Sequence, residues 1–467
     1  MNAPIVWIAA PLCLAVILLL LPGERWISYL GSLFCLILTG LAYWLPPDTA
    51  LRLGSLSIKI DSTLAIFGRK ISLSSADQVI IILVYGIGTF WFFGTLATSG
   101  GTRRIVPPGL AIIALLVASL TVEPFLYAAL LIEMAVLLSI PMLAEPGQKP
   151  GRGLLRFLIY QTFAMPFILF AGFLLSGVET GPADIALISQ AVILLGLGFA
   201  FLLSIFPLYT WVPMLAEETL PYALGFILTI FPTFSLVFGL NFIDRYSWLR
   251  DSANLGIALR LVGLLIVVSA GAWAAFQRHI GRMFAYTAVA ETGLSLLALS
   301  LPDRQAGLQI VFYLLVPRAL AYGTWTISIS ILRSHVPDLK FSNLAGLARK
   351  YPIASAGIVL SNLALAGMPL LASFPVRQAL WEKLAAQSFL SAILFGLASL
   401  GVLSAALRSL AVLTMAPQNS NWELNETWSQ RIFLVLGLVA LLAFGIYPQW
   451  AQPFLANLPF MFEHLGK

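Results

Sequence analysis

The chain has 467 residues, of which 60% are hydrophobic and 10% charged, and its mean hydropathy is +0.95. A soluble globular domain has about 25% charged residues, so this chain cannot present a hydrated surface on all sides. We therefore expect a polytopic membrane protein. The 26 lysines and arginines outnumber the 20 acidic residues. They stand singly or in pairs, without interleaved aromatics, which argues against nucleic acid as a partner.

A membrane-spanning helix needs about 20 predominantly apolar residues. The predicted fold is an all-α polytopic membrane protein, with short extra helices at 208–218 and 374–386. Fourteen spans can be drawn along the chain, at 4–22, 26–45, 77–98, 106–122, 124–144, 154–177, 186–206, 220–243, 253–275, 282–301, 307–333, 352–371, 388–415 and 429–448.

The longest early connector, 46–76, contains the alternating stretch Leu51–Ile60. A period of two predicts a short β-hairpin at the membrane surface. Lysines and arginines are concentrated in the short loops after odd-numbered spans, which places those loops in the cytoplasm. Both termini and the hairpin are then expected on the opposite side.

Glu133 is the most informative single residue, because it lies inside the apolar run Phe125–Leu143 with no cation within eleven residues. An ionisable group at such a position is costly and normally faces a partner, a bundle interior or water. Burial also favours the neutral form of a carboxyl group. A group of this kind can serve in a proton relay.

Two further ionisable residues lie in the middle of predicted spans. Glu291 falls within Ala285–Leu299, and Arg318 follows Pro317 within Ile310–Ile331. They could pair with each other as a structural element, or belong to a polar relay. Proline frees a backbone carbonyl, which favours a locally opened helix beside Arg318.

Two spans carry helix breakers. The seventh contains Pro207 and Pro213, and the twelfth contains Gly367 and Pro369. Paired interrupted helices in corresponding halves are typical of inverted-repeat transporters. The alternative is that prolines are simply tolerated in membrane helices.

Four segments together resemble the antiporter-like membrane subunits of respiratory complex I, a family shared with multisubunit sodium/proton antiporters. The segments are Ser119–Glu133, the stretch from Phe206 to Pro221 with Tyr209, Trp211 and Glu218, the stretch Arg278–Gly293, and the stretch Gly346–Pro369. The resemblance covers about residues 110–380. It implies two inverted five-helix repeats, with helices 7 and 12 broken and a line of charged residues along the bilayer midplane.

The chain departs from the family pattern at several charged positions. The resemblance places family lysines at Leu202 and Pro232, a motif histidine at Tyr209, and the twelfth-helix lysine or glutamate at Arg377. Only the fifth-helix glutamate, Glu133, is unchanged. Because arginine is not deprotonated in proteins, Arg377 can act as a fixed counter-charge but not as a proton carrier.

The resemblance implies a proton-translocating subunit of an NADH:quinone oxidoreductase, with Glu133, Glu291, Arg318 and Arg377 on the proton pathway. We expect no catalytic site, cofactor or metal in this chain. The expected partners are other membrane subunits, lipid and, indirectly, a redox arm with flavin and iron–sulfur clusters. The expected location is a bacterial inner membrane. The predicted parts are three N-terminal spans with the hairpin at 1–105, repeats at 106–244 and 252–415, and a C-terminal span and tail at 429–467.

Three alternatives remain open at this point. The same fold could serve a cation/proton antiporter or a proton-coupled inorganic-carbon transporter. A scaffold that has lost transport would explain the missing lysines, although the retained Glu133 opposes it. A quinone-binding enzyme subunit would need a head-group site, for which the sequence gives no support.

Overall fold

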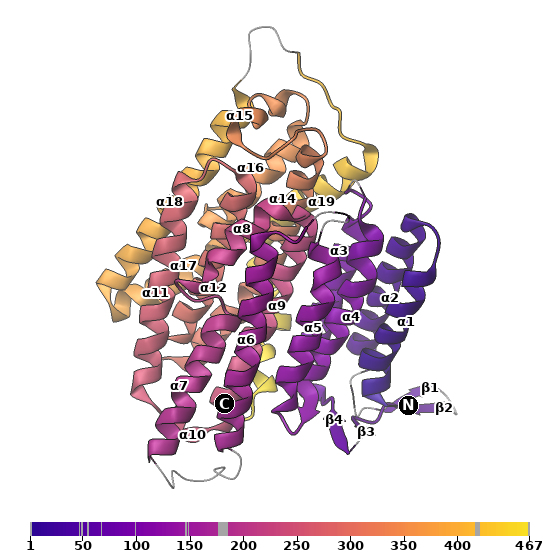
Figure 1. The fold of residues 1–467 in the computed structure, drawn as a ribbon, viewed down its shortest axis with the longest axis vertical. Helices are drawn as coiled ribbons and strands as arrows, with labels where there is room; N and C mark the ends of the chain where they lie inside the picture. Colours follow the sequence, from indigo (N-terminus) through magenta and orange to yellow (C-terminus); the bar gives the residue numbers. More distant parts are fainter. Residues whose placement is uncertain are drawn as a thin grey trace.

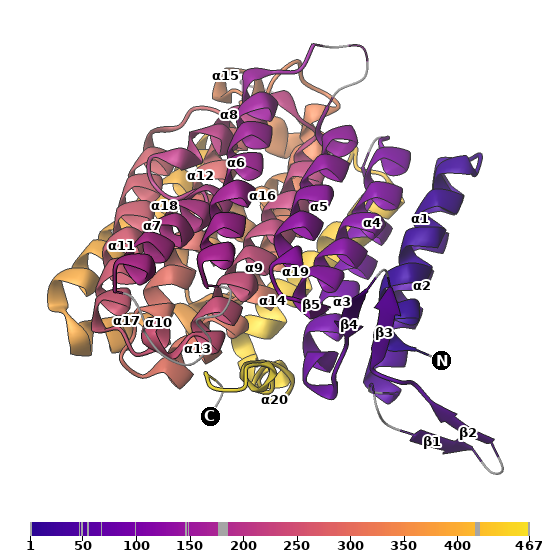
Figure 2. The same ribbon diagram turned by 60° about the horizontal axis from the view of Figure 1, so that its bottom comes forward.

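The computed structural model describes residues 2–45, 47, 50–53, 56–66, 68–98, 100–144, 147, 149–175, 185–415 and 421–465. The chain folds into a bundle of helices that run side by side (Figure 1). The N-terminal residues and the C-terminal tail lie at the same end of this bundle in both views (Figures 1 and 2).

Helices of different lengths occupy the stretches where spans were predicted. Their bounds are η1 (Ile5–Ala9) with α1 (Ala10–Leu20), α2 (Glu24–Trp44), α3 (Gln78–Gly94), α4 (Thr102–Thr121), α5 (Tyr127–Leu143), α6 (Arg152–Leu175), α7 (Ile185–Leu202), α9 (Pro221–Arg245), α11 (Ala253–Phe276), α12 (Ile280–Leu299), α13 (Arg304–Tyr313) with α14 (Leu315–Arg333), α16 (Pro352–Ala366), α18 (Phe389–Thr414) and α19 (Trp428–Ile446).

Within the described residues, nine of these helices are long and apolar enough to cross a bilayer, and four further apolar helices are shorter. A helix satisfies its backbone hydrogen bonds internally, as hydrocarbon requires. Most residues of α9 and α4 are buried, whereas most residues of α11 and α19 are partly or fully exposed. This arrangement, with apolar side chains facing outward, is that of an integral membrane protein.

Small antiparallel sheets lie at the end of the bundle that carries the termini (Figure 2). The predicted hairpin is confirmed: β1 (Ala50–Leu53) pairs with β2 (Leu56–Lys59). A second hairpin, β3 (Thr63–Ile66) with β4 (Arg69–Ser72), was not predicted, and β5 (Val122–Glu123) extends it.

Both predicted interruptions occur. α7 ends at Leu202, and the chain resumes as η3 (Leu208–Thr210) and α8 (Trp211–Glu218). α16 ends at Ala366, and α17 (Phe374–Gln387) follows a turn in which Gly367 and Leu370 have φ of +84° and +69°. The short helices predicted at 208–218 and 374–386 are therefore confirmed.

The helix around Arg318 is also interrupted, between α13 and α14 at Leu314. Pro317 then falls in the first turn of α14, where its missing N–H is not needed. Short elements complete the two ends of the bundle, namely η2 (Ser75–Asp77), α10 (Ser247–Arg250), α15 (Phe341–Leu344), η4 (Leu347–Arg349), η5 (Pro448–Trp450), α20 (Gln452–Leu455) and η6 (Leu458–Met461).

Candidate functional site

Three charged side chains from three helices meet inside the bundle. Glu291 of α12 is 1% exposed, and its carboxylate binds Arg318 of α14 through Nε at 3.4 Å. Arg377 of α17 donates from Nη2 to the other carboxylate oxygen of Glu291. The structure thus brings together the three residues that the sequence singled out in the second half of the chain.

Arg318 forms further hydrogen bonds in addition to its ion pair with the Glu291 carboxylate. Its Nη2 also donates to the backbone carbonyl of Glu291 at 2.9 Å and to Ser295 Oγ at 2.8 Å. Two guanidinium groups face one carboxylate, so the cluster carries one excess positive charge in a buried place. Since arginine does not titrate, Glu291 is the one member of this triad that can gain or lose a proton.

The break between α16 and α17 positions Arg377. A Cβ added to Gly367 would lie 3.0 Å from Arg377 Cδ, so the glycine permits both the positive φ and the close approach of the arginine stem. Pro369 lies in the exposed turn that follows. The predicted pair Gly367 and Pro369 therefore shapes the turn that presents Arg377 to Glu291.

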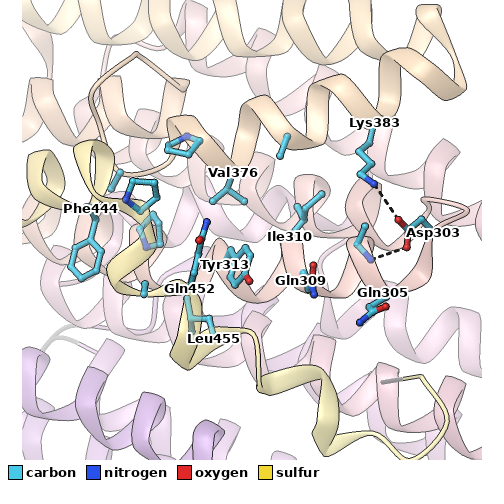
Figure 3. Close-up of a pocket in the computed structure, with 17 residues that line it drawn as sticks. Asp303, Gln305, Gln309, Ile310, Tyr313, Val376, Lys383, Phe444, Gln452 and Leu455 are labelled. Carbon is cyan, nitrogen blue, oxygen red and sulfur yellow. Dashed lines mark hydrogen bonds and ion pairs between the residues drawn. The ribbon is translucent and has the colours of Figure 1, made fainter. Parts of the chain in front are cut away.

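A cavity of about 450 Å³ adjoins the segments that carry the two arginines (Figure 3). Its wall includes Pro317 and Val376, the sequence neighbours of Arg318 and Arg377. Its other polar lining residues are Asp303, Gln305, Gln309, Tyr313, Lys383 and Gln452.

At the edge of this cavity, Lys383 Nζ lies 3.1 Å from Asp303 Oδ2, and Asp303 Oδ1 accepts from the Ala306 N–H at the start of α13. These hydrogen bonds, the backbone bond first, lower the pKa of Asp303. An ionised carboxylate therefore remains at this edge over a wide pH range.

Glu133 of α5 is partly buried and faces α6, and within the described part of the chain it has no contact with the triad. Its Oε1 accepts from Thr162 Oγ1 at 2.8 Å, and its Oε2 is buried without a hydrogen-bond partner among the described residues. Met134 and Phe163, which neighbour the pair in sequence, are exposed on the outer faces of the two helices. Glu133 is therefore a partly buried carboxyl with unused hydrogen-bonding capacity.

A small cavity of about 20 Å³ lies beside the break in α7. Leu202 and Pro232 both line it, together with Gln161 of α6 and Thr292 of α12. Gln161 Nε2 donates to the carbonyls of Phe201 and Leu202, at 3.3 and 3.4 Å, in the last turn of α7, where the carbonyls lack the regular helical hydrogen bonds. The positions that the resemblance assigns to family lysines are thus neighbours around one small and mostly apolar space.

The motif after this break is held by hydrogen bonds on both sides. Trp211 Nε1 donates to Ser204 Oγ at 2.9 Å, across the interruption. Glu218 accepts from the backbone N–H groups of Gly153 and Leu154 at 2.8–3.2 Å, so its carboxylate caps the start of α6. Next to it, Glu217 forms a two-point ion pair with Arg282 of α12.

The remaining residues of this motif, Tyr209, Pro207 and Pro213, lie in packing contacts or near the starts of helices. Tyr209 is buried, with its ring 6.2 Å from that of Tyr286 in an edge-to-face arrangement. Pro207 is exposed directly before η3, and Pro213 is the third residue of α8, where a missing N–H costs nothing.

Comparison with known proteins identifies the family. The family described as NADH:quinone oxidoreductase/Mrp antiporter, TM, matches residues 154–404, more than half of the chain. The chain belongs to this family. The resemblance noted in the sequence is therefore confirmed.

Individual family members align over long stretches. NADH-quinone oxidoreductase subunit 14 of Thermus thermophilus is 26% identical over 445 residues, covering 91% of this chain and 98% of that protein. The NADH-quinone oxidoreductase subunit N 2 of Thermodesulfovibrio yellowstonii is 26% identical over 206 residues, 44% of each chain.

Solved structures share the fold at low sequence identity. A chain of respiratory complex I from Thermus thermophilus has a TM-score of 0.79 at 18% identity, covering 99% of this chain and 100% of that one. A chain of the archaeal membrane-bound sulfane sulfur reductase reaches 0.81 at 16%, with 100% and 98% covered. A chain of the Mrp complex from Dietzia sp. DQ12-45-1b reaches 0.78 at 12%, with 99% and 97% covered.

Sequence reasoning missed several polar residues of this family member's interior. Gln161 and Thr162 are adjacent polar residues in the middle of an apolar span, and that pattern could have singled them out. Glu426 is 2% exposed and accepts from the N–H groups of Ile353 and Ala354 at the start of α16. No local signal marks Glu426, because the helix that it caps begins more than 70 residues earlier.

Proposed function

We propose that this chain is a proton-translocating membrane subunit of an assembly of the NADH:quinone oxidoreductase type. One observation carries the proposal: the buried glutamate Glu291 is held between two arginines from separate, interrupted helices. A structural ion pair needs one cation. A second arginine, placed by a helix break, adds a buried charge whose effect on Glu291 depends on the position of α17.

The route that we propose runs from Glu133 to the cavity beside the triad. Glu133 is bonded to Thr162, and Gln161, the preceding residue of α6, lines the small cavity. On the other side of that cavity is Thr292, next to Glu291. A cavity needs about 10–15 Å³ to hold one water molecule, so about 20 Å³ accommodates one.

The first half of this route differs from the second in its chemistry. Leu202 and Pro232 offer no charge at the small cavity, so protons would cross it on water rather than on a side chain. We propose that Glu133 exchanges protons where α5 meets α6, and that neighbouring membrane subunits cover the apolar surface around it.

We further propose fourteen spans with two inverted five-helix repeats, at 106–244 and 252–415. Glu133 is the tenth residue of the predicted span 124–144, and Glu291 is the tenth of 282–301. Each glutamate forms a hydrogen bond with a residue of the following span: Glu133 with Thr162, 29 residues later, and Glu291 with Arg318, 27 residues later. This matched placement supports the repeat. The proposed setting is a bacterial plasma membrane, with both termini on the non-cytoplasmic side.

The test uses the assembled complex in membrane vesicles, with NADH as electron donor and a pH-sensitive dye reporting proton uptake. We expect Glu133→Gln to lower the number of protons moved per electron, because the amide cannot carry a proton. The matched control is Glu382→Gln, which removes an exposed glutamate on α17. Native gels check that assembly is intact. An unchanged stoichiometry in Glu133→Gln would refute conduction through this residue.

A second candidate is a subunit of a cation/proton antiporter, favoured by the fold shared with a chain of the Mrp complex. A third is a scaffold without transport, favoured by Leu202 and Pro232 at the small cavity. Purifying the tagged chain in mild detergent distinguishes the redox-driven pump from the cation/proton antiporter. Flavin and iron–sulfur subunits among the co-purified proteins support the redox-driven pump, and small membrane partners alone support the antiporter.

A further inference from the structure

A crevice lies between α7 and α11, because residues of both helices line one cavity. The two helices run at the periphery of the bundle in Figure 1. This cavity has a volume of about 270 Å³, and a second cavity of about 270 Å³, lined by residues of α9, α10, α11, α12 and α13, adjoins it and continues the crevice. They share five lining residues, Leu240, Ile243, Leu255, Leu259 and Leu299. The two cavities are thus neighbouring parts of one site, one part polar and one apolar.

The apolar part is a groove with few polar groups. Its sides are Val192, Leu195 and Phe199 of α7 and Ala258 and Val262 of α11, and its floor comes from α9 and α12. Ser235 contributes a buried hydroxyl without a hydrogen-bond partner among the described residues. At Gly196 the groove is widened, because an added Cβ there would meet nothing within 4 Å.

The polar part lies toward α10, the end of the bundle that carries the termini (Figures 1 and 2). Three arginines line it: Arg250 of α10, Arg260 of α11 and Arg304 of α13. Arg260 is seven residues into α11, about 10 Å from its start at 1.5 Å per residue. Its Nε is buried and has no hydrogen-bond partner among the described residues, and the same holds for Gln387 Oε1 in this cavity wall.

The charge at this site is only partly balanced. Asp251 approaches Arg250 at 3.8 Å and Arg304 at 3.5 Å, and its side chain is 65% exposed. Asp244 lies close by, but its carboxylate accepts from the backbone N–H groups of residues 463–465. Three arginines therefore line the cavity, and the exposed carboxylate of Asp251 is paired with two of them. Such a site favours an anion, and guanidinium groups match the oxygens of a phosphate.

We propose that this crevice is a binding site for an anionic phospholipid, with its phosphate among Arg250, Arg260 and Arg304 and an acyl chain in the apolar groove. The head-group site is at the end of the spans, where lipid phosphates lie, and the groove runs from it between lipid-facing helices. Burial of the acyl chain contributes the apolar stabilisation. A protein helix is about 10 Å across, too wide for a cavity of about 270 Å³.

The test measures lipid binding to the full-length chain in mild detergent by native mass spectrometry. Phosphatidylglycerol is titrated against phosphatidylcholine with the same acyl chains. We expect the wild-type protein to bind phosphatidylglycerol at least about tenfold more tightly, the scale of a charge-assisted contact. Arg260→Gln should abolish this preference. Gly196→Leu should weaken binding of both lipids, because its side chain fills the groove.

Two matched variants serve as controls. Arg156→Gln removes an exposed arginine from α6, and Gly396→Leu adds the same side chain to α18 at a glycine where an added Cβ also meets nothing within 4 Å. Both should bind lipid as the wild type does. Glycerol 3-phosphate, which has the head-group charge without the chains, should not compete.

Three results would overturn the proposal. Unchanged phosphatidylglycerol binding in Arg260→Gln would exclude the proposed head-group site. Unchanged binding in Gly196→Leu would remove the acyl groove. Purification of the Gly196→Cys variant with a protein subunit cross-linked to the new cysteine would show that a protein partner, and not a lipid, occupies the crevice.

Discussion

The substitution Glu291→Gln is the most direct probe of the buried triad. In the native protein the carboxylate offsets one of two guanidinium charges, and the exposed fractions of the Glu291, Arg318 and Arg377 side chains are 1%, 3% and 7%. The amide leaves both cations unbalanced. Removing one partner of a buried ion pair costs about 3–5 kcal/mol, so we expect a loss of that size in the free energy of unfolding.

Removal of a cation should have a much smaller effect. Arg377→Met leaves Glu291 paired with Arg318, which keeps its bonds to the Glu291 carbonyl and Ser295. The excess charge falls from one to zero, and the methionine retains most of the buried stem. We expect a cost of about 1–2 kcal/mol, the scale of one buried hydrogen bond lost.

The assay is unfolding of the full chain in mixed micelles by increasing sodium dodecyl sulfate, followed by circular dichroism. The double variant closes a thermodynamic cycle, in which Glu291→Gln should cost less once Arg377 is absent. We expect a coupling of about 1–3 kcal/mol. The argument from charge balance would be refuted if Glu291→Gln lowered the free energy of unfolding equally with and without Arg377. It would also be refuted if Arg377→Met lowered it more than Glu291→Gln does.

Three further predictions concern stability. Glu218→Ala removes the carboxylate that caps α6, and it should lower the free energy of unfolding by about 1–2 kcal/mol in the same assay. Glu217→Ala removes a half-exposed ion pair and should lower it by less than about 1 kcal/mol. Equal losses in the two variants would show that Glu218 does not stabilise α6 as a cap. Burial, followed by the charge of Arg282, lowers the pKa of His279 to about 4, and its Nδ1 accepts from the Arg282 N–H. The unfolded chain binds this proton near pH 6.5 and the folded chain only near pH 4, so stability should fall by about 1–3 kcal/mol as pH drops through that window. Thermal melting of His279→Ala should lack that part of the slope, and a slope identical to that of the wild type would exclude His279 as its source. Gly367→Ala should cost at least about 1–2 kcal/mol, because alanine is strained at a φ of +84° and its Cβ meets Arg377; wild-type stability of this variant would show that the turn relaxes freely.

The sequence anticipated the elements whose causes are local. Clusters of proline and glycine located the breaks after Leu202 and Ala366, although single prolines such as Pro166 and Pro232 lie inside continuous helices. Alternation over Leu51–Ile60 was enough to predict a hairpin. The second hairpin has strands of four residues, as the first has, but Thr63–Ile66 lacks the regular alternation of apolar and polar residues seen in Leu51–Ile60. The third strand of this sheet, β5, follows β4 only after α3 and α4 in the sequence, and no local sequence pattern indicates such a pairing.

The candidate site was predicted in part for the same reason. Charges in apolar runs stand out, so Glu133, Glu291 and Arg318 could be named from sequence alone. The geometry of the triad could not, because Arg377 reaches Glu291 from 86 residues away across a helix break. The partner of Glu133 is a threonine, a residue type too common in membrane helices to be selected without coordinates.

The two adjacent glutamates at the end of α8 have a mechanical consequence. Glu218 holds the start of α6, in the first half of the chain, and Glu217 holds Arg282 of α12, in the second. A rotation of α8 about its own axis would break both sets of bonds together. A displacement of this short helix that keeps these bonds would carry the starts of α6 and α12 with it, and the chain would have to bend in the non-helical segments 203–207 and 219–220 that join α8 to its neighbours.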